Sequence, residues 1–291
     1  MPTTIQDIPS KRVLSIVYYM RQELSGEYPV RELEALIHYA FKEILGYNRI
    51  DLMMRSEDEL LPGVFDHFQE VTERLKDHEP IQYIFGHTAF YGLDLIVNSN
   101  VLIPRPETEE LVHWVLSEQK NRKLARALDI GTGSGCIALA LKKHLREAEI
   151  TGVDVSQSVV EQAIENARHN RLNVNFELRN ILNQPADLGS FDLIVSNPPY
   201  VTREQMGGMM PNVLNYEPHL ALFVEDNDPL KYYKAIGHFC QKALSSDGAL
   251  YLEVNEDLAT DTAHLLETFN FTSTSIKKDL NGKFRMVKAM W

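Results

Sequence analysis

The chain has 291 residues, and its 29 Lys and Arg against 41 Asp and Glu give a formal net charge of −12. An apolar fraction of 44% is enough to bury a core, which excludes a wholly disordered chain. No run approaches the roughly 18 apolar residues of a membrane span, and residues 1–10 lack a signal-peptide pattern. Two cysteines exclude a disulfide scaffold, so a cytoplasmic protein is predicted. The acidic charge disfavours an open electrostatic grip on nucleic acid.

The first 80 residues are predicted to form a bundle of helices. Apolar residues recur at helical spacing over residues 30–45 and again over 64–75, which indicates one buried face on each helix. Residues 81–100 then combine glycines with an alternating pattern at Leu93, Leu95 and Val97. This alternation favours a strand and predicts a hairpin linker.

From residue 101 onward, short apolar strands alternate with helices. Strands are predicted at 127–130, 149–153, 174–178, 191–195, 249–254, 271–276 and 284–289. Helices are predicted at 136–145, 157–170, 229–244 and 262–269. Such alternation predicts an α/β fold in which helices cover both faces of a mostly parallel sheet. The expected domains are therefore a bundle at 1–80, a linker at 81–100 and a catalytic domain at 101–291.

A glycine-rich turn follows the first of these strands. Its residues are Gly131, Thr132, Gly133, Ser134 and Gly135. Glycines let the backbone turn sharply and approach a ligand closely. The spacing is G-x-G-x-G, which differs from the G-x-G-x-x-G fingerprint of dinucleotide sites. A plain strand-to-helix turn is the alternative interpretation.

Asp154 ends the next strand, 19 residues after Gly135. An acid in this position can accept hydrogen bonds from both hydroxyls of a ribose. Alternatively, it caps the helix predicted at 157–170. Together with the glycine turn, it indicates a nucleoside-type ligand. The missing third fingerprint glycine favours S-adenosylmethionine over NAD.

The segment Asn197-Pro198-Pro199-Tyr200 follows the strand at 191–195. Consecutive prolines fix φ near −65° and remove two backbone donors, which leaves a stiff corner rich in acceptors. Such a corner can hold both N–H bonds of an NH₂ group attached to a planar system, with Tyr200 offering a stacking face. The nitrogen lone pair would then face a sulfonium methyl group, so that positioning supplies most of the catalysis. A rigid turn without a ligand is the alternative.

These segments resemble the protein-(glutamine-N5) methyltransferases of peptide-chain release factors, the PrmC/HemK family. The resemblance also rests on residues 82–86, 102–109, 216–218, 221–222 and 279–282. It implies a class I S-adenosylmethionine-dependent methyltransferase fold, which is Rossmann-like with a seven-stranded, mostly parallel sheet. The implied substrate is the glutamine of the Gly-Gly-Gln motif in release factors, and the implied role of the bundle is to dock that partner.

The resemblance also implies roles for individual residues. Gly131 to Gly135 would line the methionine part of S-adenosylmethionine, and Asp154 would hold its ribose. The adenine would lie near Val155, Asn180 and Ile181, although Asn180 stands where the family usually has Asp. Asn197 would touch both cofactor and glutamine, and Pro198, Pro199 and Tyr200 would face the glutamine amide. Catalysis is assigned to Asn197, Pro198 and Tyr200, the product is S-adenosylhomocysteine, and no metal, membrane or direct nucleic-acid substrate is expected.

Three alternatives remain open from the sequence. A nucleic-acid methyltransferase acting on adenine N6 or guanine N2 uses the same corner, but the charge of −12 and the lack of a large insertion count against it. A nicotinamide-dependent oxidoreductase would require G-x-G-x-x-G and a catalytic His or Tyr-Lys pair. A binding protein without catalysis would have no need of an intact corner.

Overall fold

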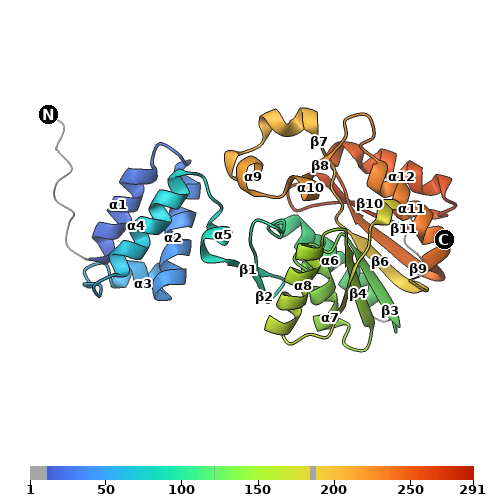
Figure 1. Ribbon diagram of the computed structural model, residues 1–291, viewed down its shortest axis with the longest axis horizontal. Coiled ribbons are helices and arrows are strands. Elements are labelled where there is room, and N and C mark those ends of the chain that lie inside the picture. The colour runs from blue at the N-terminus through green and yellow to red at the C-terminus, as the bar shows by residue number, and fades with distance from the viewer. Residues whose placement is uncertain (1–11, 121, 184–187) are drawn as a thin grey trace. The chain divides into compact units, whose positions relative to one another are not determined.

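The computed structural model describes residues 12–120, 122–183 and 188–291. These residues form two compact units (Figure 1). The first unit holds the described residues up to Phe85 together with 211–216, and the second holds 86–210 and 217–291. Residues 1–10, on which the expectation about export rests, lie outside the described residues. The functional boundaries after residues 80 and 100 stay predictions.

The first unit is a helical bundle. Its helices are α1 (Val13–Leu24), α2 (Val30–Leu45), α3 (Arg49–Met54), α4 (Val64–Lys76), α5 (Ile81–Phe85) and α9 (Pro211–Tyr216). The predicted helices at 30–45 and 64–75 are confirmed as α2 and α4, and their apolar faces meet where the Phe41 and Phe68 rings lie 4.4 Å apart. Helix α2 ends at Gly46, whose left-handed φ of 71° suits glycine. The short helix α5 was not predicted and lies in the stretch expected to be a linker.

The second unit is built on a twisted sheet. Over the described residues this sheet has seven strands in the order β10-β11-β9-β6-β3-β4-β5. Their bounds are β3 (Arg126–Ile130), β4 (Glu149–Asp154), β5 (Asn175–Leu178), β6 (Phe191–Ser196), β9 (Leu244–Glu253), β10 (Ser273–Lys278) and β11 (Phe284–Met290). The pairs among β3, β4, β5, β6 and β9 are parallel, whereas β11 is antiparallel to both neighbours. The predicted mostly parallel sheet is confirmed.

Helices cover both faces of this sheet (Figure 1). Helices α6 (Pro106–Gln119), α7 (Cys136–His144) and α8 (Gln157–His169) share one hydrophobic core, and α11 (Lys231–Ala243) and α12 (Ala259–Thr268) share the other. Alternation along β3 explains the division, because Ala127 packs in the first core and Leu128 and Ile130 pack in the second. The sheet is therefore sealed on both sides, and a ligand can approach it only at an end.

Shorter elements complete the second unit. The predicted hairpin is confirmed as β1 (His87–Phe90) paired with β2 (Leu93–Ile96), and it is fastened to α8 through Ile96 N–H and Asn166 Oδ1 at 2.7 Å. Between β6 and α11 the chain forms β7 (Val201–Thr202), η2 (Arg203–Gly208), α10 (His219–Leu222) and β8 (Phe223–Val224), with α9 among them. Two further 3₁₀ turns are η1 (Ile181–Asn183) and η3 (Glu256–Leu258). In the described part of the chain, no helix has both the length and the apolar content needed to cross a bilayer.

Candidate functional site

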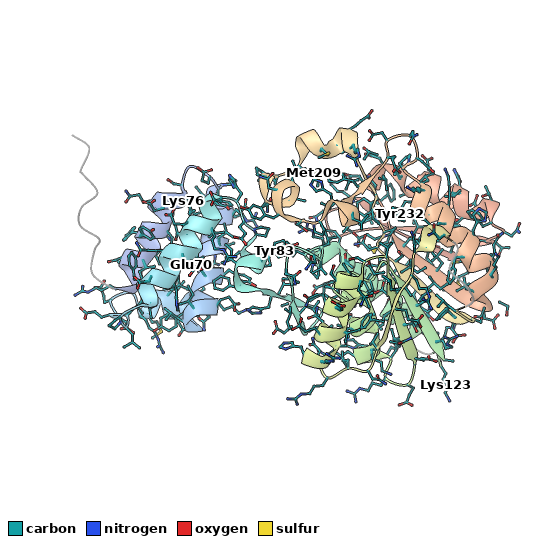
Figure 2. All side chains as sticks on the ribbon, viewed as in Figure 1. Glu70, Lys76, Tyr83, Lys123, Met209 and Tyr232 are labelled. Carbon is teal, nitrogen blue, oxygen red and sulfur yellow. The ribbon has the colours of Figure 1, made fainter. Side chains whose placement is uncertain are left out.

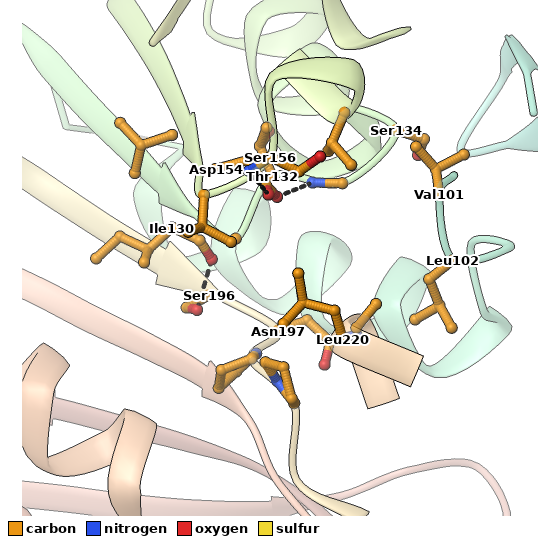
Figure 3. Close-up of a pocket in the computed structure, with 18 of the residues that line it drawn as sticks. Val101, Leu102, Ile130, Thr132, Ser134, Asp154, Ser156, Ser196, Asn197 and Leu220 are labelled. Atoms are coloured by element: carbon orange, nitrogen blue, oxygen red, sulfur yellow. Dashed lines mark hydrogen bonds between the residues drawn. The ribbon is translucent and has the colours of Figure 1, made fainter. Parts of the chain in front are cut away.

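A cavity of about 400 Å³ opens at the carboxyl ends of β3, β4 and β6 (Figure 3). The strand order reverses at β3, with β4 and β5 on one side and β6 and β9 on the other. Loops that leave such a point diverge, and the crevice between them is where open α/β sheets bind ligands. The residues predicted from sequence that line it are Gly131, Thr132, Gly133, Ser134, Asp154, Val155, Asn180, Ile181, Asn197, Pro198 and Pro199. Two of the predicted site residues, Gly135 and Tyr200, are not among the described residues that line the cavity.

The glycine turn lies between β3 and α7. Gly131, Gly133 and Gly135 all have positive φ, which glycine adopts without steric cost. A Cβ on Gly133 would meet no atom within 4 Å, so the backbone there is open to the cavity. A Cβ on Gly135 would instead lie 3.2–3.3 Å from Phe176, Ala163 and Leu139. Gly135 therefore serves close packing of the turn.

Asp154 connects the glycine turn to the start of α8. Its Oδ2 accepts a hydrogen bond from Gly133 N–H, and its Oδ1 accepts one from Ser156 N–H, both at 3.1 Å. Burial raises the pKa of Asp154, whereas the backbone donors lower it. The alternative that Asp154 caps this helix is wrong, because Ser156 is the N-cap residue of α8 and no side chain caps that helix. Asp154 orders the residue just before the helix instead. The same carboxyl group also lines the cavity, so a contact with a ligand is open to it.

Asp129 was not predicted as a site residue, although it stands two positions before the first glycine. It is fully buried, and its Oδ2 accepts hydrogen bonds from Thr132 Oγ1 (2.6 Å) and Ala138 N–H (3.2 Å). Its Oδ1 is buried and has no hydrogen-bond partner. Burial raises the pKa of Asp129 to about 7. Asp129 is not among the described residues that line the cavity, and its contacts with Thr132 and Ala138 order the turn from beneath.

The Asn-Pro-Pro-Tyr corner follows β6 and faces the glycine turn. Ser196 Oγ donates to Ile130 O at 2.6 Å, which ties the end of β6 to the end of β3. A Cβ on Gly131 would lie 4.0 Å from the carbonyl oxygen of Asn197, so the two motifs lie side by side. Asn197 Nδ2 donates to Thr108 Oγ1 at 3.1 Å, and the Tyr200 hydroxyl donates to Glu253 Oε1 at 3.1 Å.

Residues 101–105 form a further wall of the cavity, which includes Leu102, Pro104 and Arg105. The buried carboxylate of Glu217 holds this wall, because it accepts from Ile103 N–H at 3.2 Å and from Arg105 Nη2 at 2.5 Å. Helix α6 then begins at Pro106. Only the family resemblance signalled this wall, since its spacing carries no chemical motif of its own.

Val155, Asn180 and Ile181, the residues expected near adenine, also line the cavity. Val155 is 46% exposed, and Ile181 is buried. Asn180 Oδ1 accepts a hydrogen bond from Leu182 N–H at 2.9 Å, so that side chain orders the turn η1. Tyr232 on α11, labelled in Figure 2, also lines the cavity and was not predicted. Its spacing on an amphipathic helix does not separate it from core residues.

The sequence matches two families of known domains. Residues 121–283 match a methyltransferase domain, and residues 18–86 match the PrmC N-terminal domain. The release factor glutamine methyltransferase of Flavobacterium psychrophilum is 44% identical over 92% of this chain and 95% of its own. That of Bacteroides thetaiotaomicron is 38% identical over 94% of this chain and 98% of its own.

Solved structures agree on the fold. A methyltransferase from Pyrococcus furiosus has a TM-score of 0.53 at 21% identity and covers 75% of this chain and 98% of its own. A 16S rRNA N2 G1207 methyltransferase from Thermus thermophilus, solved with AdoMet and guanosine, has a TM-score of 0.51 at 18% identity. The match covers 70% of this chain and 49% of that methyltransferase. Likeness at this level shows the class I methyltransferase fold alone. With the close relatives and both domain matches, the chain belongs to the family of release factor glutamine methyltransferases.

Proposed function

We propose that the protein transfers a methyl group from S-adenosylmethionine to the side-chain amide nitrogen, N5, of the glutamine in the Gly-Gly-Gln motif of peptide-chain release factors. The observation that carries this proposal is the convergence of the glycine turn, Asp154 and the Asn-Pro-Pro corner on one cavity. The names of the relatives support the substrate. Cys136 and Cys240 are free buried thiols, which suits the reducing cytoplasm where we place this activity.

The residues around the cavity fit the cofactor. The backbone at Gly133 lines the cavity and is open to it, so it would border the methionine part. Asp154 would hold the ribose hydroxyls, and Val155, Asn180 and Ile181 would border the adenine. When bound, S-adenosylmethionine supplies a methyl group on a positively charged sulfur.

The corner residues orient the substrate amide. The side-chain oxygen of Asn197 and the backbone oxygens of Asn197 and Pro198 are acceptors for its two N–H groups, and the rings of Pro198 and Pro199 keep this backbone rigid. An amide nitrogen is a weak nucleophile because its lone pair is delocalised. Fixed acceptors direct that lone pair, and alignment of this kind can contribute up to about 7–11 kcal/mol. The nitrogen becomes acidic on methylation, so the corner needs no strong base.

Replacing Asp154 by alanine is expected to weaken S-adenosylmethionine binding by about 1.5–3 kcal/mol, because hydrogen bonds to a charged group are lost. Isothermal titration calorimetry measures the change. Glu161 to alanine, on the same helix that Asp154 leads into, is a matched control because Glu161 does not line the cavity among the described residues. An unchanged affinity in the Asp154 variant would show that this acid only orders the turn and the helix start.

The substrate is tested by methyl transfer from labelled S-adenosylmethionine to a purified bacterial release factor, to DNA and to ribosomal RNA in parallel. Label is expected in the release factor alone, and mass spectrometry of its peptides should place the methyl group on the Gly-Gly-Gln glutamine. Label in nucleic acid without label in the factor would contradict the proposal and favour the nucleic-acid alternative.

A further inference from the structure

We propose that Thr108 and Glu253 are positioning residues, which hold the side-chain amide of Asn197 with its oxygen toward the cavity. The inference rests on the proposed function, since it concerns how the corner receives a glutamine amide. Thr108 lies on α6 and Glu253 ends β9, so neither belongs to the corner itself. Both side chains are buried.

A chain of hydrogen bonds connects these residues. Asn197 Nδ2 lies 3.1 Å from Thr108 Oγ1, and Thr108 Oγ1 lies 2.7 Å from Glu253 Oε2. The other oxygen of Glu253 accepts from the Tyr200 hydroxyl at 3.1 Å. Burial raises the pKa of Tyr200, which keeps this hydroxyl protonated as a donor. The carboxylate therefore binds one hydroxyl on each oxygen.

The number of protons decides which way the amide of Asn197 faces. An ionised carboxylate can only accept hydrogen bonds, so the single proton of Thr108 must point to Glu253. The hydroxyl oxygen of Thr108 then offers only lone pairs to Asn197, and the amide must present its NH₂ group there. Oδ1 lies on the other side of the amide, which leaves an acceptor for the substrate. A reversed amide would present a donor to the N–H groups of glutamine and repel them.

Glu253 is surrounded by groups that influence its charge. Arg285 on β11 favours the ionised form, Glu107 on α6 opposes it, and Tyr233 on α11 donates to the backbone oxygen of Glu253. Cys136 on α7 also faces this carboxyl group, because the charge of Glu253 contributes to raising the pKa of the Cys136 thiol. Burial raises the pKa of Glu253 to about 7. Below that pH the carboxyl group gains a proton, the proton of Thr108 is released toward Asn197, and the reversed amide becomes accessible.

Replacing Thr108 by valine tests the role with nearly the same volume. We expect kcat for the intact release factor to fall about tenfold, which corresponds to one lost hydrogen bond, with KM and S-adenosylmethionine affinity unchanged. Thr108→Ser keeps the hydroxyl and should restore most of kcat. Thr262→Val on α12 is the matched control, because it removes a buried hydroxyl that has no partner and lies outside the site. It should leave kcat unchanged.

Two further measurements separate positioning from a merely structural role. Adding Thr108→Val to Asn197→Ala should cost little beyond Asn197→Ala alone, because Thr108 acts through Asn197. The ratio of wild-type to Thr108→Val kcat should be largest above pH 7 and should shrink below it, and this ratio cancels other titrations such as that of Asp129. Any one of three results would overturn the positioning role and leave the proposed function intact. These results are additive losses of kcat in the double variant, a kcat ratio that does not change with pH, and a Thr108→Val variant as active as an active wild type. A wild type that methylates no release factor would contradict the proposed function as well.

Discussion

Replacing Asn197 by alanine is expected to lower kcat about 10²- to 10³-fold while S-adenosylmethionine affinity stays nearly unchanged. The side chain supplies an acceptor that is already oriented by Thr108, and the loss of a preorganised polar contact at the reacting group has effects of this size. Single-turnover assays with an intact release factor measure the chemical step, and calorimetry measures cofactor binding. A lower rate of the chemical step with an unchanged cofactor affinity is what a residue that acts on the substrate should show.

Asn175 to alanine is the control for this experiment. Asn175 begins β5, and its amide donates to Glu177 away from the cavity, so its loss should change neither kcat nor affinity. Thermal unfolding of both variants shows whether the lost contact with Thr108 disturbs the fold. An Asn197 variant with wild-type turnover would remove the acceptor from the mechanism.

The sheet and its helices were predictable because the strands are short apolar runs and the helices bury residues at a regular period. Strand β6 is a nearly continuous apolar run and helix α8 is buried at spacings of three to four, and both were predicted to within two residues of their observed ends. Residues 201–224 carry no such period. Their elements are two to six residues long, and α9 among them packs in the first unit rather than with its neighbours in sequence. Tertiary contacts decide such segments, and a local pattern does not report them.

The site was predictable where a motif ends a strand and unpredictable where the contact is distant in sequence. The glycine turn, Asp154 and the Asn-Pro-Pro-Tyr corner all lie at the carboxyl ends of parallel strands. The topology of the sheet therefore brings these three features together. Thr108, by contrast, lies 89 residues from Asn197, and Glu217 lies 112 residues from Arg105. Tyr200 illustrates the remaining gap. Its hydroxyl is bound to Glu253 and its ring packs in the core shared by α11 and α12, so its expected stacking on the substrate stays a prediction.

Removing residues 1–85 is expected to lower kcat/KM for an intact release factor by about 10²-fold or more. If the bundle docks the factor, its binding energy is used to place the glutamine, and loss of remote binding energy appears in kcat/KM. Helix α3 offers a surface for such docking, because Ile50, Met53 and Met54 are exposed apolar side chains on it. Cofactor affinity should persist, since the described residues that line the cavity all belong to the second unit.

A short Gly-Gly-Gln peptide separates docking from chemistry in this experiment. The peptide lacks the rest of the factor, so the full chain and the shortened chain should methylate it at the same rate. A second variant, Met53→Glu with Met54→Glu, keeps the bundle and should lower kcat/KM for the intact factor alone, because charge on an apolar contact surface must be desolvated on binding. Full activity of both variants on the intact factor would show that the bundle has another purpose.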